Sequence, residues 1–156
     1  MDALTLLKQD HRKVDELLKE ANALGPGAAA SRQKLFKAID QELTIHSKIE
    51  ETVFYPALKA KAKAEKEEDA KQEVLEAYEE HGNVAAMLKK LEATEPKDET
   101  YAAKLQVLSE LVKHHVHEEE HEMFKQAKDL FDKAELEELG QQLERAKSEQ
   151  KAVAAR

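Results

Sequence analysis

Apolar side chains recur at steps of three and four residues along most of the chain, which places them on one face of an α-helix. The first such stripe predicts a helix over about residues 2–23, and this helix stops at the GPG motif at 25–27. The second begins at about residue 31 and passes Pro56. Because proline lacks an amide hydrogen, we expect this helix to kink or break near Pro56 and then continue.

Three further stripes complete the pattern. One runs from Val74 to Leu91 and ends at the TEPKDE segment, and the next runs from Leu105 to Glu119. The last predicts a helix over about residues 134–152, which we expect to pack outside the main bundle. Strand-type runs of Val, Ile and Thr are absent. The pattern therefore predicts an all-α fold, an up-down four-helix bundle over about residues 1–131 with an additional C-terminal helix.

Composition and charge narrow the class of protein. Charged residues make up 37% and apolar residues 41% of the chain, with four glycines and three prolines, as is typical of helical proteins. A length of 156 residues is enough for a buried core, so we expect a single domain over residues 1–156. The net charge of −8 repels nucleic acid on average, and no basic stripe offsets it.

Several classes of site and location are disfavoured. The chain contains no cysteine, which excludes disulfides, thiolate metal sites and cysteine catalysis. The start of the sequence lacks a basic region followed by an apolar stretch, and no run approaches the roughly 20 apolar residues that span a bilayer. We therefore expect a cytoplasmic protein that binds neither nucleic acid nor membrane. The sequence gives no indication of a protein partner.

Four successive stripes each carry one histidine on their apolar face: His11, His46, His81 and His115. A buried polar group without a partner costs about 1–3 kcal/mol. One such residue would be a hydrogen-bonded core histidine, but four, one per helix, require a common partner. Counted from the predicted turns, their depths along an up-down bundle agree within about 5 Å. All four imidazoles can therefore meet at one level.

Two glutamates add oxygen donors at the right spacing. Glu50 follows His46 by four residues, and Glu119 follows His115 by four, so each pair shares a helix face. One such pair alone is more often a surface contact than a ligand pair. Imidazole with carboxylate suits iron, manganese or zinc. The donors are too many for one ion and reasonable for two. The predicted metal ligands are His11, His46, Glu50, His81, His115 and Glu119.

The segment ELVKHHVHEEEHEMF, residues 110–124, offers an alternative interpretation. His117 and His121 match the zinc-protease pattern H-E-x-x-H. At about 100° per residue, however, they point about 200° and 240° away from His115, off the buried stripe. His114 lies at its edge. We therefore expect His115 to be the inner residue, and a zinc hydrolase is the less favoured hypothesis.

Taken in order, four segments resemble the hemerythrin-like family known as HHE cation-binding domains. They are QDHRKVDELL, HSKIEETVFYPAL, EEHGNVAAML and HHVHEEEHEMF, and the resemblance covers about residues 1–130. It implies a four-helix bundle that holds two iron ions in a non-haem di-iron centre with an oxygen-derived bridge. The four stripe histidines would be terminal ligands, and Glu50 and Glu119 would bridge. The resemblance also implies binding or sensing of dioxygen, peroxide or nitric oxide, or handling of iron.

The sequence departs from the oxygen-carrying members of that family. They have two histidines four residues apart in the third helix, whereas His81 has Ala77 and Ala85 at those positions. The last motif also has glutamate where the carriers use an aspartate one residue further along. One iron would lose a nitrogen ligand, which puts reversible oxygen carriage in doubt. Glu51 could fill the gap, and Tyr78 is a further candidate, although a core position suits Tyr78 better.

Four functions remain compatible with the sequence. The leading hypothesis is a binding or sensing protein with a di-iron site. An oxidase or a peroxide-consuming enzyme could use the same site, and so could a protein that stores or buffers metal. A bundle without a metal function is disfavoured by the joint histidine pattern. The sequence does not separate the first three.

Overall fold

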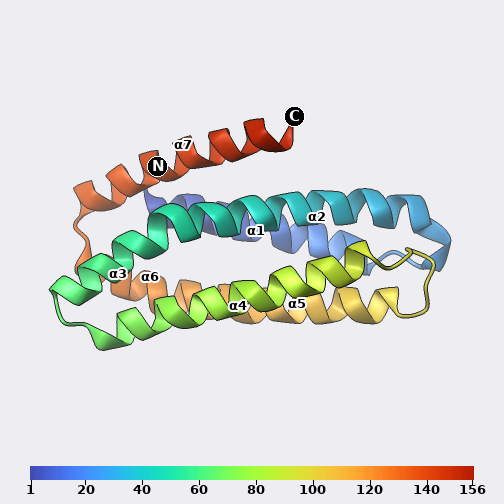
Figure 1. Cartoon of the computed structure of the whole chain (residues 1–156), viewed down its shortest axis with the longest axis horizontal. Coiled ribbons are helices and arrows are strands. Elements are labelled where there is room, and N and C mark those ends of the chain that lie inside the picture. Colours follow the sequence, from blue (N-terminus) through green and yellow to red (C-terminus); the bar gives the residue numbers. More distant parts are fainter.

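The computed structural model describes residues 1–156, and all of its regular structure is helical. The long helical rods of the bundle run alternately in opposite directions, with a further helix along one outer side (Figure 1). The rods begin with α1 (Ala3–Asn22), α2 (Ala29–Ile49), α4 (Glu68–Glu92) and α5 (Tyr101–Glu118), and the 3₁₀ turn η1 (Pro26–Ala28) follows α1. The all-α bundle with an additional C-terminal helix is confirmed. No helix has the length and apolar character that crossing a membrane requires.

The second and the fourth rod each contain a π-turn at the corresponding position of their helix. The second rod continues from α2 through η2 (Glu50–Phe54) into α3 (Tyr55–Ala64). The fourth continues from α5 through η3 (Glu119–Met123) into α6 (Phe124–Leu130). The Tyr55 amide donates to the Glu50 carbonyl, and the Phe124 amide donates to the Glu119 carbonyl. Each bond spans five residues instead of four, which stacks residues i and i+5 on one face.

The π-turns change the predicted stripes. The expected kink or break near Pro56 takes the form of a π-turn immediately before the proline, and the rod stays continuous. Val53 is half-buried, whereas Phe54 and Tyr55 are fully buried. The second π-turn was not predicted, because no proline marks it. Single π-turns inside α-helices are frequent at functional sites.

The apolar core is divided into two clusters. One cluster of 18 buried residues includes Leu7, Phe54 and Phe124 and joins the start of α1 to α3, α6 and the C-terminal helix. The other, with 13 buried residues, includes Val14, Phe36 and Leu108 and lies toward the α1–α2 and α4–α5 turns. The predicted ligand residues are buried at positions along the rods between these two clusters. The predicted ligand residues therefore form a polar layer with a leucine-rich cluster on each side.

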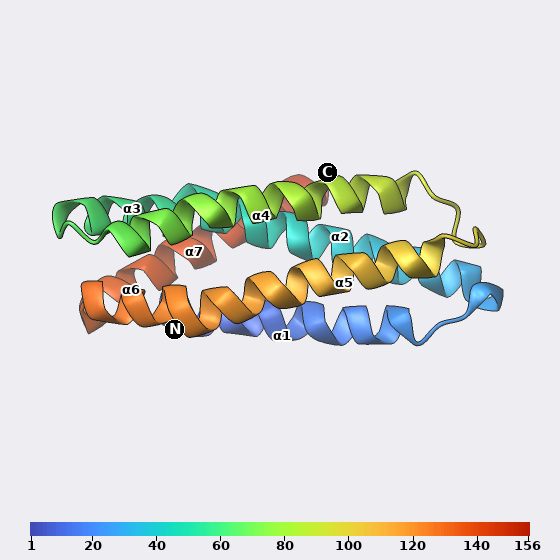
Figure 2. The same cartoon turned by 90° about the horizontal axis from the view of Figure 1, so that it is seen from below.

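The C-terminal helix α7 (Lys133–Ala154) lies along the outside of the bundle (Figure 1), and it is partly hidden behind the other helices in the view from below (Figure 2). It contacts α1, α2 and η2. Asp132 caps it in a capping box with Glu135, and its buried leucines face the bundle. Gly140 sits where α7 meets the start of the chain. A Cβ atom at this position would lie 2.2 Å from the backbone oxygen of Met1. The close approach of α7 therefore depends on the missing side chain.

The two helical glycines should respond in opposite directions to substitution by alanine. Gly140→Ala should lower the free energy of unfolding by about 1–3 kcal/mol, because the added methyl group overlaps the backbone of Met1 and Asp2. Gly82→Ala should raise it by about 0.5–1 kcal/mol, because nothing lies within 4 Å of its Cβ position and alanine favours the helix. Denaturant unfolding of both variants checks this. Equal stability of the two would contradict the close α7 contact.

Candidate metal centre

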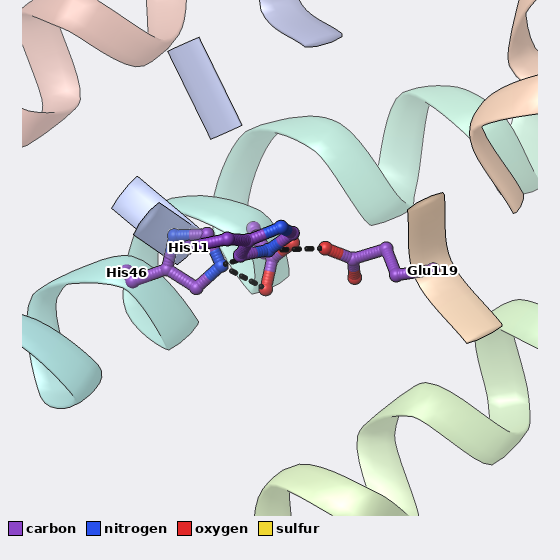
Figure 3. A group of neighbouring side chains, drawn as sticks. His11, His46 and Glu119 are labelled. Atoms are coloured by element: carbon purple, nitrogen blue, oxygen red, sulfur yellow. Dashed lines mark hydrogen bonds and ion pairs between the residues drawn. The ribbon is translucent and has the colours of Figure 1, made fainter. Parts of the chain in front are cut away.

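Side chains from three different elements converge at the middle of the bundle. Figure 3 shows His11 from α1, His46 from α2 and Glu119 from η3 pointing toward one another. The Nε2 atoms of His11 and His46 lie 3.2 Å apart. Glu119 Oε1 lies 3.0 Å from His11 Nε2. These inward-facing nitrogen and oxygen atoms belong to the first of two donor groups.

The second donor group contains His81 from α4 and His115 from α5, and it shares Glu50 with the first group. Glu50 contacts histidines of both groups. Its Oε1 atom is 3.1 Å from His46 Nε2 and 3.2 Å from His81 Nε2. His115 Nε2 lies 3.3 Å from Glu119 Oε2. The donor atoms form two compact groups that share Glu50, and the remaining oxygen of Glu50 is buried without a hydrogen-bond partner. A buried carboxylate oxygen without a partner fits a cation as its ligand.

The structure therefore brings all six predicted residues into one buried cluster. Their spacing agrees with the depth estimate from the sequence, because the four histidines meet at one level. The role of these residues as metal ligands stays a prediction. The cluster is made of imidazole and carboxylate alone, as iron, manganese or zinc prefer.

Every inward histidine has an acidic partner on its outer nitrogen. The four pairs are His11 Nδ1 with Glu120 at 2.6 Å, His46 Nδ1 with Asp10 at 2.9 Å, His81 Nδ1 with Glu51 at 3.1 Å, and His115 Nδ1 with Glu80 at 2.7 Å. A carboxylate that accepts from Nδ1 fixes the ring orientation and leaves Nε2 for the centre. Metal-bound histidines in proteins are supported in this way. None of these four acidic partners was predicted from the sequence in this role.

These contacts repeat with an internal twofold pattern. In each pair of helices, the acidic residue just before the first histidine contacts the second histidine. The acidic residue just after the inner glutamate contacts the first histidine of the other pair. Residues 10, 11, 46, 50, 51 and 55 of one half thus correspond to residues 80, 81, 115, 119, 120 and 124 of the other. The chain builds the centre from two equivalent halves.

The acidic neighbours control the proton affinity of the buried imidazoles. Burial lowers the pKa of His46, but the charge of Glu50 and the hydrogen bond to Asp10 outweigh burial and raise it to about 10. For His115, burial again lowers the pKa, and contacts with Glu119 and with a second glutamate raise it to about 11. Without a cation, these rings therefore carry protons at neutral pH. A metal ion would take the place of the inner proton.

Tyr55 is a central residue that the sequence interpretation missed. Its hydroxyl donates to Glu119 Oε2 at 2.5 Å and lies 3.2 Å from Glu50 Oε1. It also lies 3.2 Å from His81 Nε2 and 3.4 Å from His115 Nε2. Burial comes first in raising the pKa of Tyr55 well above its usual value, followed by the charges of the two glutamates. The phenol oxygen therefore sits among donors from both halves.

The two side chains suggested for the gap near His81 lie elsewhere. Glu51 contacts the outer nitrogen of His81 and not the interior of the cluster. Tyr78 donates from its hydroxyl to the backbone carbonyl of Glu51 at 3.4 Å and is half-buried. The signal that could have identified Tyr55 is an aromatic residue five positions after the inner glutamate, present in both halves.

A lysine of the C-terminal helix reaches the partner of one histidine. Lys147 donates to one oxygen of the buried Asp10, whose other oxygen contacts His46 Nδ1. Burial raises the pKa of Asp10, but the contacts with His46 and Lys147 outweigh it and lower the pKa overall. Helix α7 thus takes part in the polar network, although nothing in its sequence marked Lys147.

The remaining histidines of the HHVHEEEH segment lie outside the cluster. His117 and His121 are exposed and stack on each other with ring centroids 4.2 Å apart, and His121 Nδ1 contacts the His117 carbonyl at 2.9 Å. His114 is also exposed and lies near Glu80 and Glu118. The geometry therefore lends no support to a zinc site at the H-E-x-x-H match.

Known proteins share this sequence and arrangement. Residues 2–127 match the family described as "Hemerythrin HHE cation binding domain". A crystal structure of a hemerythrin HHE cation binding domain-containing protein from Mycobacterium kansasii is similar with a TM-score of 0.85 and 26% identity, covering 99% of this chain and 90% of that one. The family match confirms the resemblance predicted from the four motifs.

A curated relative is also similar along most of the chain. The DNA nickase of Nostoc sp. (strain PCC 7120 / SAG 25.82 / UTEX 2576) is 24% identical over 148 residues, which is 95% of this chain. The chain spans 40% of the length of that relative. The similarity therefore concerns one part of the nickase.

Substitution of single histidines should show which of them bind metal in the buried cluster and which lie outside it. His115→Ala should lose bound metal, because its Nε2 faces the interior of the cluster, 3.3 Å from Glu119 Oε2. His117→Ala and His121→Ala should retain it, because both rings are exposed and stack on each other away from the cluster. Metal content per chain after identical purification gives the answer. Metal loss in the two outer variants with retention in His115→Ala would contradict the assigned geometry.

Metal removal should loosen the protein without unfolding it. The two leucine-rich clusters persist, so most of the helical circular dichroism should survive at neutral pH and room temperature. Binding that favours the native state adds about 3 kcal/mol at 100-fold excess over Kd, so Tm should fall by about 5–10 °C on chelation. His46→Ala serves as control and should not respond to the chelator. An unchanged Tm in the unsubstituted protein would mean that the four histidines share no metal.

Proposed function

Because the chain belongs to the hemerythrin HHE cation-binding family, we propose that its buried cluster holds two iron ions and binds or senses dioxygen, peroxide or nitric oxide. The observation that carries the proposal is the pair of donor groups that share Glu50, with each histidine held from outside by a carboxylate. Bound iron supplies the electron-transfer and Lewis-acid chemistry that these small molecules require.

The donor chemistry is compatible with iron, and the family resemblance favours iron over manganese and zinc. The donors are four imidazoles and two carboxylates, without the thiolate or thioether that selects copper. His11, His46 and Glu119 converge on one position, while His81 and His115 converge on a second. The contacts of Glu50 support a bridging role, since its Oε1 contacts histidines of both halves and its Oε2 has no partner.

A small cavity beside the histidines suits a ligand of two atoms. It has a volume of about 20 Å³ and is lined by the four inner histidines and by apolar side chains that include Val14, Leu43 and Val112. A volume of about 10–15 Å³ is enough to hold one water-sized molecule. The cavity therefore favours a small neutral molecule over an organic substrate, in agreement with a site for dioxygen, peroxide or nitric oxide.

A cleft on another side of the centre supports iron handling as part of the same proposal. It is lined by six glutamates together with His115, and the glutamates are Glu73, Glu76, Glu80, Glu118, Glu119 and Glu122. Burial, and then the charges of Glu122 and Glu76, raise the pKa of Glu73 to about 7. Crowded carboxylates of this kind attract divalent cations toward the buried donors.

The similarity to a DNA nickase does not suggest an action on DNA. The chain carries a net charge of −8, which opposes the phosphate backbone, and it spans 40% of that relative. We propose that the part of the nickase that is similar to this chain is a metal-binding bundle. A peroxide-consuming or oxidase activity remains the alternative function, because it would use the same donors.

Reconstitution with ferrous iron should decide among these functions. Protein expressed in iron-replete medium should contain two iron atoms per chain by elemental analysis. After anaerobic loading with ferrous iron, addition of oxygen or nitric oxide should give a stable, reversible change in the visible spectrum. Continued consumption of added peroxide would instead favour the enzyme.

Two controls make the result specific to the centre. His117→Ala should behave as the unsubstituted protein, whereas His46→Ala should lose iron together with the spectral response. One zinc and no iron per chain after iron-replete expression would overturn the proposal.

A further inference from the structure

One buried carboxylate beside the centre is paired with a cation of the protein itself. Asp10 on α1 is 3% exposed, and its Oδ2 atom accepts from His46 Nδ1 at 2.9 Å. Its other oxygen, Oδ1, accepts from the ammonium group of Lys147 on α7. The contacts from Lys147 to Asp10 and from Asp10 to His46 therefore connect the C-terminal helix to an inner histidine, whose Nε2 faces the cluster.

The internal twofold pattern shows that this arrangement belongs to one half only. Asp10 corresponds to Glu80, whose Oε1 atom accepts from His115 Nδ1 at 2.7 Å. The other oxygen of Glu80 lies 3.6 Å from Nε2 of the exposed His114, which is longer than a hydrogen bond. The carboxylates that support His46 and His115 therefore differ, because a lysine ammonium group neutralises only the first.

We propose that Lys147 is a positioning residue of the centre, which acts through Asp10 and raises the reduction potential of the iron held by His11 and His46. The inference rests on the proposed function. Hydrogen bonds to the outer nitrogen of a metal-bound histidine and charges close to the site are two ways in which a protein adjusts the potential of its metal. Lys147 affects both.

The two effects of the lysine act in the same direction. Its ammonium group draws electron density from Asp10, which makes Asp10 a weaker acceptor and His46 a less electron-rich ligand. Asp10 and His46 are buried, so the added positive charge is screened less than it would be at the surface. Both effects disfavour ferric iron more than ferrous iron, because the ferric ion carries the larger positive charge. Removal of the lysine charge should therefore lower the potential.

The test compares substitutions of Lys147 in iron-loaded protein. Iron content and helical circular dichroism are measured first, and the visible spectrum is then followed in a mediated redox titration, in which ferric iron takes up one electron from dithionite. Lys147→Met should lower the midpoint potential, so that the ratio of ferrous to ferric iron at the original midpoint falls about tenfold, or about 59 mV for a one-electron step. Lys147→Arg should restore the original potential, because arginine keeps the charge.

Lys61→Met is the matched control for the docking of α7. Lys61 Nζ contacts Glu135 Oε2 at 2.9 Å, so it links α3 to the start of α7 without contacting Asp10. Its removal changes the net charge by the same amount and also removes an ion pair of α7, but the potential should stay that of the unsubstituted protein. An equal fall in potential in Lys61→Met and Lys147→Met would assign the effect to loosening of α7 and overturn the inference.

Lys147→Gln covers the case in which Lys147→Met does not load iron. Glutamine keeps a hydrogen-bond donor for Asp10 and removes only the charge, so the potential should fall in this variant as well. Two bound irons with an unchanged potential in Lys147→Gln would overturn the role of Lys147 and leave the proposed function standing. An unsubstituted chain that binds no iron would overturn both.

Discussion

Six ionisable side chains must share one buried level of a helical bundle, and the rest of the structure conforms to this constraint. An ionised group in an apolar interior is tolerated only with partners. Here each imidazole contacts one acidic residue outside and one or two oxygens inside. The apolar residues are placed in two separate clusters, so that neither is interrupted by charge.

Regular helical periodicity made part of the centre predictable from the sequence. His11, His46 and His81 stand on apolar stripes with a period of 3.6 residues, so their meeting at one level could be inferred from the stripes and the predicted turns. Tyr55 could not be predicted in this way. At about 100° per residue it would point about 140° away from Glu50, and the π-turn removes that difference. No local signal marks η3, where the helix shows the same five-residue bond at Phe124.

Contacts between distant segments also could not be predicted from the sequence. Lys147 is 137 residues from Asp10, and its contact with that buried carboxylate depends on how α7 docks. The twofold pattern was also overlooked, because it consists of a few positions at uneven spacing instead of a repeat of fixed period. His11 and His46 are 35 residues apart, whereas the equivalent His81 and His115 are 34 apart. The pattern is visible only when the acidic partners are known.

The acidic partners also raise the proton affinity of the histidines in the buried cluster. With pKa values of about 10 and about 11, the rings of His46 and His115 hold protons at neutral pH where cations are expected to bind. A divalent cation that bound to these donors would displace the protons on their inner nitrogens. Acid would therefore compete with metal for the same nitrogen atoms.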